Sequence, residues 1–326
     1  MALIKKPLVF IDGQEGTTGL QIYERLGSRD DIELILIDPA KRKDVSERQK
    51  LLNSADLVFL CLPDDAARES VELITGDKTR VIDASTAHRT HPDWVYGLPE
   101  LSPEHRERVA HARFVANPGC HATGFIVSVY PLIKLGILPV DYPLTCFSLT
   151  GYSGGGKSMI SDYEERKTES MSAPGIYALT LKHKHLPEMI AVTGLTRAPI
   201  FCPIVDDYYK GMATSITLHT DMLLKKVSAE DIRQTLTTYY SEHLSANSPK
   251  SDSGEKPVRR YVSVAPELGS STLYSNMGAG TNDLEITVSG NEAQILITAR
   301  FDNLGKGAAG AAVQNMEIML GLEVSQ

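Results

Sequence analysis

The sequence has little cysteine, few aromatic residues and no long apolar run. Among 326 residues there are four cysteines, and aromatic residues make up 6%. Four cysteines without regular spacing do not form the disulfide framework of a small secreted protein. No run approaches the roughly 18 consecutive apolar residues of a membrane-spanning helix, and residues 1–7 lack the features of a signal peptide. These absences predict a cytoplasmic protein with no membrane partner.

Positive charge is also scarce. Lys and Arg number 33 against 41 Asp and Glu, which gives a formal net charge of −8. Nucleic-acid binding needs clustered basic residues that displace phosphate counterions, so the charge argues against a nucleic-acid partner. One or two local arginines would still hold a small anion. The length, with 42% hydrophobic and 23% charged residues, predicts a globular chain of two domains.

In the first third of the chain, short apolar runs alternate with helical patterns. The runs cover residues 8–11, 32–37, 56–62 and 80–83. Helical spacing over 20–27 predicts that Leu20, Ile22, Tyr23 and Leu26 are available for burial, and a second helix is expected around 66–74. Near-continuous apolar strands separated by helices indicate a parallel sheet covered on both faces. We predict a doubly wound α/β domain over residues 1–118.

Beyond Cys120 the pattern changes to longer, alternating strands, which is typical of an α+β domain with antiparallel strands. The expected strands are 213–219, 261–264, 284–289 and 294–301. A helix is predicted from His121 to Leu135, broken by Pro131 or ending near Gly136. The second domain should span 119–302, and the C-terminal segment 303–326, with a helix over 307–320, should pack back on the first domain. Residues 245–256 predict an exposed loop.

A glycine-rich turn follows the first strand and opens the first helix. Gly13, Gly16 and Gly19 would allow a tight turn and close approach of a dinucleotide pyrophosphate to the helix N-terminus. At the end of the second strand, Asp38 suits a ribose 2′-hydroxyl, whereas the basic run 41–43 suits a 2′-phosphate. The residues alone therefore leave NAD and NADP open.

A second glycine motif competes with the first. Residues 151–158 match the Walker A pattern, in which Lys157 would reach phosphate oxygens and Ser158 would hold Mg²⁺. This supports an alternative, a nucleotide-hydrolysing protein. Against it, the place after the first strand is already taken, and no Walker B strand is evident because 204–206 is short and follows Pro203. A glycine loop lining an active site is the favoured interpretation.

The thiol of Cys120 has a distinctive setting in Asn117-Pro118-Gly119-Cys120. It follows a turn and starts a predicted helix, and a helix N-terminus stabilises a thiolate. We predict that Cys120 is a nucleophile. The other cysteines, Cys61, Cys146 and Cys202, lie among apolar residues and are expected to be inert.

Histidines are the candidates for the base that serves this thiol. His121 is adjacent to Cys120, but neighbours on a helix point apart, so it is not assigned. His183 and His185 stand two residues apart before Pro187, and in an extended segment they would share a face. A metal site is the alternative, although no third ligand is evident and the flanking lysines would repel a cation. We favour His185 and leave His183 open.

The segment from Asp83 to Arg89 ends the fourth predicted strand. In an open parallel sheet, cofactor and substrate gather at the carboxyl ends of the strands. Arg89 is placed there to hold an anion through two parallel hydrogen bonds.

These motifs occur in an order that resembles the N-acetyl-γ-glutamyl-phosphate reductases, within the aspartate-semialdehyde dehydrogenase-like superfamily. The matching segments are 13–19, 83–89, 96–100, 117–120, 150–154, 183–188 and 302–310. The length and the form Asp-Ala-Ser-Thr-Ala-His-Arg are similar to the shorter of the family's two types. The longer type carries a Ser/Arg-type segment after the second strand, where this chain has Asp38 and the basic run.

The resemblance implies a Rossmann domain, a mixed-sheet α+β domain, NADP(H), no metal, and a homo-oligomer, commonly a tetramer. It implies reduction of an acyl phosphate through a Cys120 thioester in arginine biosynthesis, with His185 or His183 as acid and base. The implied substrate contacts are Arg89, Asn117, Ser153 and Gly154. The implied cofactor contacts are Gly13, Gly16, Thr17, Thr18, Gly19, Asp38, Ser85, Asn303 and Gly305. Aspartyl phosphate, N-acetyl-aminoadipyl phosphate and a non-catalytic cofactor-binding role stay open, and the residues that read the N-acetyl group are not identified.

Overall fold

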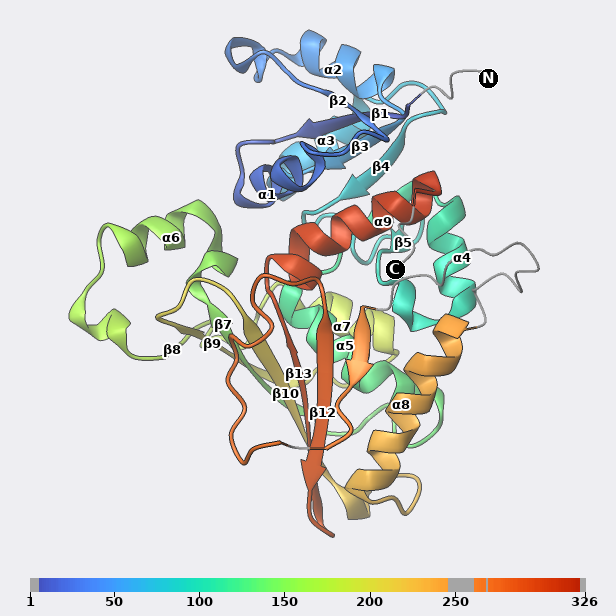
Figure 1. The fold of residues 1–326 in the computed structure, drawn as a ribbon, viewed down its shortest axis with the longest axis vertical. Coiled ribbons are helices and arrows are strands. Elements are labelled where there is room, and N and C mark those ends of the chain that lie inside the picture. Colours follow the sequence, from blue (N-terminus) through green and yellow to red (C-terminus); the bar gives the residue numbers. More distant parts are fainter. Residues whose placement is uncertain (1–5, 246–260, 268, 323–326) are drawn as a thin grey trace. The chain divides into compact units, whose positions relative to one another are not determined.

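The computed structural model describes residues 6–245, 261–267 and 269–322 and divides into two compact units (Figure 1). Unit 1 comprises Met1–Leu98, Arg106–Pro118 and Ala308–Glu323. Unit 2 comprises Pro99–His105, Gly119–Gly307 and Val324–Gln326. Apart from Ser245, the loop predicted over 245–256 lies outside the described residues.

Unit 1 contains a parallel sheet of six strands in the order β2-β1-β3-β4-β6-β5. The strands are β1 (Leu8–Asp12), β2 (Glu33–Ile35), β3 (Leu57–Leu60), β4 (Arg80–Asp83), β5 (Val95–Tyr96) and β6 (Phe114–Ala116). Every neighbouring pair described in this sheet is parallel. The predicted doubly wound α/β fold is therefore confirmed.

Both faces of this sheet are covered by helices because alternate strand residues point to opposite sides. Val9 of β1 and Phe59 of β3 lie in one apolar cluster, together with side chains from α1 (Thr17–Leu26), α4 (Pro103–His111) and α9 (Gly310–Leu320). Phe10 and Val58 lie in the other cluster, with α2 (Val45–Ser54) and α3 (Asp64–Glu72). Strands buried on both faces explain the near-continuous apolar runs in the sequence.

Some local predictions in unit 1 were wrong. Ile22 and Leu26 are buried one turn apart on α1, whereas Leu20 lies off that face and is 44% exposed. The second strand is shorter than predicted, since β2 ends at Ile35 and Leu36 is exposed. Helix α2 was not predicted, because it buries little apolar surface apart from Leu51 and Leu52.

The last helix begins later than expected. A π-helical turn occupies Gly305–Ala309, and α9 follows from Gly310. Met316 and Met319 of α9 lie in the unit 1 core with residues of α1 and the sheet. π-Turns are rare and occur frequently at functional sites.

Unit 2 contains a mixed sheet of seven strands in the order β11-β12-β13-β10-β7-β9-β8. The strands are β7 (Thr145–Gly151), β8 (Gly175–Ile176), β9 (Ile200–Asp206), β10 (Met212–His219), β11 (Val262–Val264), β12 (Leu284–Gly290) and β13 (Gln294–Phe301). The β7–β9 and β11–β12 pairs are parallel and the other pairs are antiparallel. The predicted α+β class with a mixed sheet is confirmed.

The two faces of the unit 2 sheet differ. Helices α5 (Cys120–Lys134) and α8 (Ala229–Ser245) pack on one face, whose side chains, such as Ile216 and Ile297, are fully buried. The opposite face combines hydroxyls, including the Ser215–Thr298 pair at 2.8 Å, with partly exposed apolar side chains. We call this second surface the open sheet face; its partly exposed apolar residues include Phe147, Leu149, Cys202, Ile204 and Leu296.

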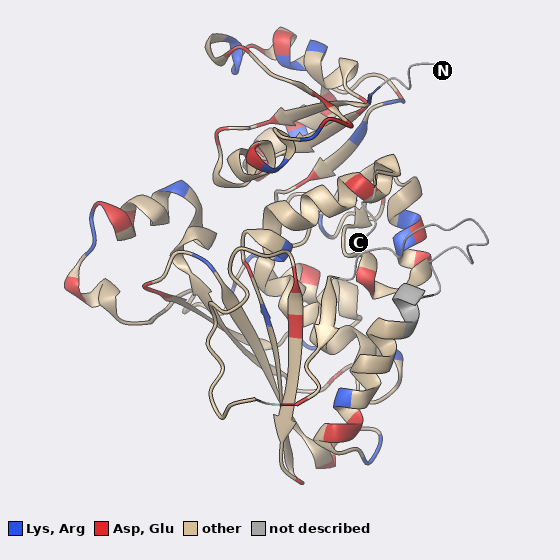
Figure 2. Cartoon of the chain, viewed as in Figure 1, with Lys and Arg blue, Asp and Glu red and all other residues tan. Residues whose placement is uncertain are grey.

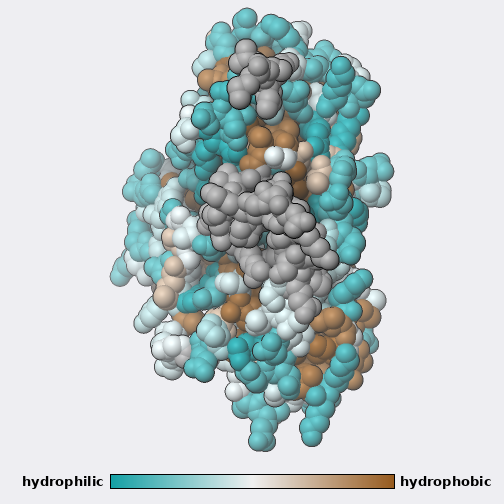
Figure 3. Space-filling view, turned by 45° about the vertical axis from the view of Figure 1, so that its right-hand side comes forward, coloured by the Kyte–Doolittle hydropathy of each residue, from teal (hydrophilic) through white to brown (hydrophobic). Residues whose placement is uncertain are grey.

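The surface is mainly polar. Acidic and basic residues are interspersed along the helices of both units (Figure 2), in keeping with the modest net charge of −8. The space-filling view shows hydrophobic residues in small groups within a mostly hydrophilic surface (Figure 3). Among the described residues, no helix has the length and apolar character needed to cross a membrane.

Candidate active site

The glycine-rich turn of unit 1 is built mainly from backbone. Gly13 has a φ of +88°, and a Cβ there would collide with the carbonyl group of Cys61. A Cβ on Gly19 would collide with the carbonyl oxygen of Gly13, so this glycine lets α1 pack on the turn. At Gly16 the nearest atoms would be 3.4 Å away, which leaves ordinary room beside the helix N-terminus.

This arrangement fits a dinucleotide pyrophosphate. The first glycine makes the turn, the second leaves the backbone accessible, and the third allows close packing of the helix. Thr17 begins α1, and its buried Oγ1 has no hydrogen-bond partner among the described residues. Thr18 follows in the first turn of α1. The backbone amides of a first helical turn can bind an anion, because they have no partner within the helix.

Charged side chains border the turn. Asp38 is exposed and accepts a hydrogen bond from the amide of Ala40 at 2.9 Å, so it caps the short 3₁₀ turn Pro39–Lys41. Arg42 forms an ion pair with Glu15, which lies inside the glycine-rich turn. The basic run predicted to meet a 2′-phosphate therefore places one guanidinium directly beside the turn.

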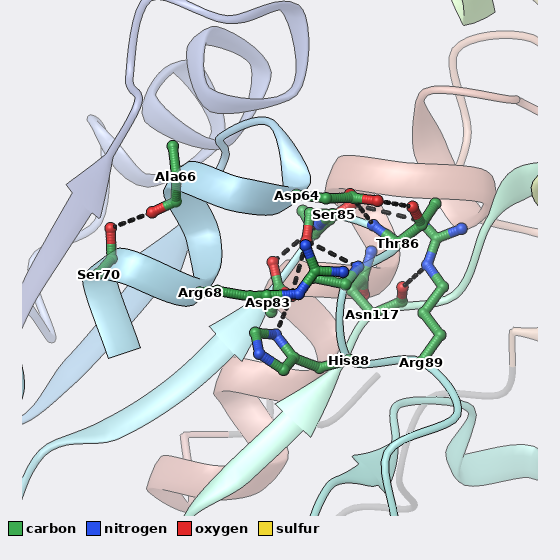
Figure 4. A network of polar contacts seen from close by, with 12 residues as sticks. Asp64, Ala66, Arg68, Ser70, Asp83, Ser85, Thr86, His88, Arg89 and Asn117 are labelled. Carbon is green, nitrogen blue, oxygen red and sulfur yellow. Dashed lines mark hydrogen bonds and ion pairs between the residues drawn. The ribbon is translucent and has the colours of Figure 1, made fainter. Parts of the chain in front are cut away.

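At the end of β4 the Asp83 carboxylate organises the next loop (Figure 4). It accepts hydrogen bonds from the amide and hydroxyl of Ser85, both at 2.8 Å, and lies 2.6 Å from His88 Nδ1. The His88 ring stacks on Trp94 with centroids 4.1 Å apart. Asp83, Ser85 and His88 are all buried, so the loop that carries Arg89 is held from within.

Arg89 is tied to backbone carbonyls (Figure 4). Its Nε donates to Asn117 O at 3.0 Å, and its Nη2 donates to Ala84 O at 3.2 Å. The side chain of Asn117 is buried, and its Nδ2 donates to Ala308 O at 3.0 Å. Asn117 Oδ1 accepts from Asn315 Nδ2 at 3.2 Å. Both ends of the Asn117 amide are thus engaged within unit 1, and its substrate-binding role stays a prediction.

In unit 2, Cys120 is the first residue of α5. The preceding amide of Gly119 donates to Glu188 Oε2 at 3.1 Å, and Glu188 is only 1% exposed. Cys120 is half-buried and is not part of a disulfide. A Cβ on Gly307 would lie 2.8 Å from Cys120 Cβ, so the backbone of the π-turn approaches this cysteine closely. The helix N-terminus favours the thiolate over the thiol.

The histidines predicted as bases lie together. The rings of His183 and His185 have centroids 4.7 Å apart, and each lies within 5.6 Å of the His121 ring. The segment is a turn rather than extended, since Leu186 N donates to His183 O and His185 caps α7 (Leu186–Thr193). His183 Nδ1 accepts a hydrogen bond from the His185 amide at 3.1 Å, which occupies that ring nitrogen.

Sequence reasoning missed the part played by His121. Its ring lies among those of His183 and His185, the two histidines predicted as bases. Its Nδ1 lies 2.7 Å from Ser148 Oγ and its Nε2 lies 2.8 Å from the Tyr177 hydroxyl. Burial lowers the pKa of His121 to about 3. Burial also raises the pKa of Tyr177, and the Cys120 charge adds to that effect.

Tyr177, Glu188 and Gly307 were likewise missed as neighbours of the thiol. Tyr177 and Glu188 flank the predicted histidine segment, and that proximity was the available signal. Gly307 is distant from Cys120 in the sequence and lies in a run of small residues, so its place beside Cys120 can be recognised only in the folded structure. Among the described residues, no group of His, Cys, Asp and Glu is arranged to hold a metal ion.

The Walker A match does not form a phosphate cradle. The amides of Tyr152 and Ser153 donate to the carbonyls of Tyr208 and Tyr209, at 2.9 and 3.0 Å. β7 pairs antiparallel with β10 and parallel with β9. β9 runs from Ile200 to Asp206 through Pro203, so the expectation that this segment is too short for a strand was wrong. Burial raises the pKa of the Cys61 and Cys146 thiols, as expected of inert cysteines.

Asn303 holds the same glycine loop in place. Its Nδ2 donates to Ser153 Oγ at 3.0 Å, and its Oδ1 accepts from the Gly211 amide at 2.8 Å. Gly154 lies beside Asn303 and is exposed, while Gly305 is in close backbone contact with Thr281. The predicted ligand contacts of these residues stay predictions.

Comparison with known proteins identifies the family. Residues 33–109 match the semialdehyde dehydrogenase NAD-binding domain, and residues 120–303 match the semialdehyde dehydrogenase dimerisation domain. Among solved structures, aspartate semialdehyde dehydrogenase II from Vibrio cholerae aligns with a TM-score of 0.71 at 15% identity, covering 97% of this chain and 99% of that chain. The Candida albicans aspartate semialdehyde dehydrogenase aligns with a TM-score of 0.67 at 15% identity, covering 97% and 99%. At such identities the likeness shows the fold alone.

Curated relatives are closer in sequence. The chain is 48% identical to N-acetyl-γ-glutamyl-phosphate reductase 2 of Nostoc sp., over 98% of both chains. It is 45% identical to N-acetyl-γ-glutamyl-phosphate reductase 2 of Pseudomonas putida, over 97% of both. The predicted resemblance is confirmed, and the chain is an oxidoreductase with a nicotinamide-cofactor domain. It belongs to the semialdehyde dehydrogenase family, in the group of the N-acetyl-γ-glutamyl-phosphate reductases.

Proposed function

We propose that the chain reduces N-acetyl-γ-glutamyl phosphate to N-acetylglutamate 5-semialdehyde and phosphate, with NADPH, in arginine biosynthesis. The proposal is supported by the similar proteins and by the arrangement of residues around Cys120. Relatives with this name match nearly the whole chain at 41–48% identity. The observation that carries the chemistry is Cys120 at the start of α5, followed directly by His121, whose ring clusters with those of His183 and His185.

In the proposed reaction, the Cys120 thiolate attacks the acyl carbon and forms a tetrahedral oxyanion. The first amides of α5 are natural donors to that oxyanion. Collapse expels phosphate and leaves a thioester on the sulfur. A reduced nicotinamide cofactor held at the glycine-rich turn would supply the hydride for the thioester carbonyl. Protonation of the resulting oxyanion gives a thiohemiacetal. Return of that proton to the base then breaks the carbon–sulfur bond and gives the aldehyde and the Cys120 thiolate.

We assign the proton transfer to His185 in preference to His183. A general base needs an unprotonated ring nitrogen that is available to the substrate. In His183, Nδ1 accepts from the His185 amide, so the neutral ring carries its proton on Nε2. His185 is 5% exposed and stands at the start of α7. Replacing each by Asn separately should therefore lower kcat more at His185.

Arg89 is proposed to hold the phosphoryl group. Its bonds to Asn117 O and Ala84 O fix the guanidinium plane, and a fixed planar guanidinium is suited to a tetrahedral anion. Asn117, Ser153 and Gly154 are proposed to line the substrate position. Asn117 and Ser153 would act chiefly through the backbone, since their side chains are engaged inside their own units.

NADP is the proposed cofactor. The turn at Gly13, Gly16 and Gly19, with Thr17 and Thr18, would hold the pyrophosphate. Arg42 would meet the 2′-phosphate, and Asp38 would lie at the ribose. Ser85, Asn303 and Gly305 complete the proposed cofactor contacts. Binding of 2′-AMP that is tighter than binding of 5′-AMP would support the 2′-phosphate site.

We further propose a homo-oligomer, with a tetramer as the expected state. The open sheet face supports this, because it leaves apolar side chains partly exposed within the region that matches a dimerisation domain. Leu149 and Ile204 are paired neighbours on adjacent strands of that face. Leu149→Glu should lower the mass measured by light scattering, whereas an unchanged mass would exclude this face from the interface.

The decisive assay runs the reaction in reverse. Purified chain would be given N-acetylglutamate semialdehyde, phosphate and NADP⁺, with aspartate semialdehyde and NAD⁺ in parallel. Phosphate-dependent NADPH formation that is selective for the acetylated substrate is expected. A preference for aspartate semialdehyde would contradict the proposed substrate, and a fully active Cys120→Ser variant would contradict the thioester.

A further inference from the structure

Asp12 places a buried carboxylate directly before the glycine-rich turn. It is the last residue of β1, and Gly13 begins the turn. The Asp12 side chain is only 6% exposed. Consecutive Cα atoms are about 3.8 Å apart, so the short aspartate side chain keeps its charge close to the turn. A negative charge at this position opposes the binding of a dinucleotide pyrophosphate, which is itself an anion.

This carboxylate faces α2 and α3. Phe10 lies in the apolar cluster with these two helices, and Asp12, two residues further along β1, points to the same side. Arg48 of α2 forms an ion pair with it, with Nη2 2.9 Å from Oδ2 and Nε 3.4 Å from Oδ1. Ser70 of α3 completes the group, since its Oγ lies 2.9 Å from Asp12 Oδ2 and 2.6 Å from Arg48 Nη2.

Arg48 is the group that cancels the charge of Asp12. The Ser70 hydroxyl has a single proton and lies 2.8 Å from Ala66 O as well as near the carboxylate. Within the part of the chain that the structure describes, the Arg48 guanidinium is the only cation in an ion pair with Asp12. The Arg48 side chain is 12% exposed, so solvent screens this pair much less than it screens a surface pair.

The surface of the same turn carries a second ion pair, which provides a comparison. Arg42 pairs with Glu15, and their side chains are 51% and 61% exposed. Water can replace either partner there, so Arg42 is able to leave Glu15 for a 2′-phosphate. Arg48 is instead held by both Asp12 and Ser70, so it keeps its place whichever dinucleotide binds.

We propose that Arg48 is a positioning residue for the cofactor, which enables the glycine-rich turn to bind a pyrophosphate by cancelling the charge of Asp12. This role rests on the proposed function only in placing a dinucleotide pyrophosphate at the turn. NAD⁺ and NADP⁺ share the pyrophosphate, so Arg48 should affect the binding of both equally. If the pair merely held the shape of the turn, losing either member would weaken binding.

The first test replaces each member of the pair and measures the binding of NAD⁺ and of NADP⁺ by calorimetric titration. Arg48→Met leaves the Asp12 charge uncancelled and should weaken the binding of both dinucleotides by roughly three- to tenfold. Asp12→Asn keeps an acceptor for Arg48 but removes the negative charge, so it should strengthen both by a similar factor. Weaker or unchanged binding in Asp12→Asn, or unchanged binding in Arg48→Met, would overturn the proposal.

Two matched variants separate charge from packing. Arg48→Lys keeps the cation but loses the two-point contact, so most of the affinity should be retained. Ser70→Ala removes a hydrogen-bonding partner of both charged groups without changing the net charge. It should lower the free energy of unfolding and leave the dinucleotide affinities near wild type. Equal weakening of binding by Ser70→Ala and Arg48→Met would assign the effect to packing and overturn the proposal.

The remaining comparisons keep the test independent of folding and of the reaction. Asp12→Asn leaves the buried cation with a hydrogen-bond acceptor, so its tighter binding decides the matter even if Arg48→Met fails to fold. Arg42→Ala should change the binding of NADP⁺ alone. Weaker binding in both Arg48→Met and Asp12→Asn, in a chain whose wild type still catalyses the proposed reaction, would remove only the role of Arg48. Wild-type chain that binds neither dinucleotide would remove the pyrophosphate site and the proposed function with it.

Discussion

The glycine-rich turn of unit 1 and the thiol cluster of unit 2 are made in different ways. The turn is backbone: Gly13 and Gly19 are required because a Cβ would meet main-chain atoms nearby. The thiol cluster consists of side chains: His121, next to Cys120 on α5, lies against Tyr177 and His185, which come from later segments of the chain. Backbone sites are specified by short spacings and can be read from sequence. Side-chain clusters depend on where the fold brings distant residues.

The largest expected effect lies in unit 2. Cys120→Ser should lower reductase activity by on the order of a thousandfold or more, because the alkoxide of serine is not formed at neutral pH. Cofactor affinity, measured by fluorescence titration, should stay unchanged, since the turn of unit 1 does not depend on that thiol. Weakened cofactor binding in this variant would show that the two sites are not independent.

Alanine substitutions should distinguish the packing role of Gly19 from the cofactor-binding role of Gly16. Gly19→Ala should reduce the free energy of unfolding by about 1–3 kcal/mol, because its Cβ would overlap the Gly13 carbonyl. Gly16→Ala is the matched control, since its Cβ meets only ordinary contacts at 3.4 Å. Urea unfolding should leave Gly16→Ala near wild type, while calorimetric titration should show weaker cofactor binding. Equal destabilisation of both would contradict these roles.

Lowering the pH should reduce the folding stability of unit 2, because His121 binds its proton in the unfolded chain first. Its folded pKa of about 3 lies below the ordinary value of 6.5, so between these values the unfolded chain binds one more proton. Stability should therefore fall as pH falls through this window, by about 1 kcal/mol per pH unit from this group. Urea unfolding of His121→Gln should show a shallower loss between pH 6.5 and 4.5. An equally steep loss would assign the effect to other groups.

The smallest expected effect is on cofactor affinity, through the Arg42–Glu15 ion pair beside the glycine-rich turn. Arg42→Ala should weaken NADP binding by about tenfold relative to NAD, the scale of one charged hydrogen bond. Glu15→Gln should strengthen NADP binding slightly, because it removes the carboxylate that competes for Arg42. Calorimetry at low salt measures both. An unchanged NADP-to-NAD ratio in Arg42→Ala would remove this residue from cofactor recognition.

The sequence predicted strands β1 to β4 of unit 1, with β2 too long, and the helix that begins at Cys120, because apolar runs and a turn before a helix are local signals. The short strands β5 and β6 were not predicted. β4 begins and ends at the predicted residues, and α5 begins one residue early. The sequence could not predict His121, since its importance depends on Ser148 and Tyr177. Leu20 was wrongly expected to be buried, because one helical turn offers several apolar residues and only the packing selects among them.

The hydrogen bonds that join His121 to Ser148 and Tyr177, and Ser148 to Thr214, also bear on the order of folding. They join residues 27, 56 and 66 positions apart in the sequence. Closing such long loops costs entropy before the contacts repay it, so these bonds form late. The turn from Gly13 to Gly19 closes over a few residues. We expect a newly synthesised chain to shape its nucleotide-binding turn first and to bring His121, Ser148 and Tyr177 together only when the unit 2 sheet is complete.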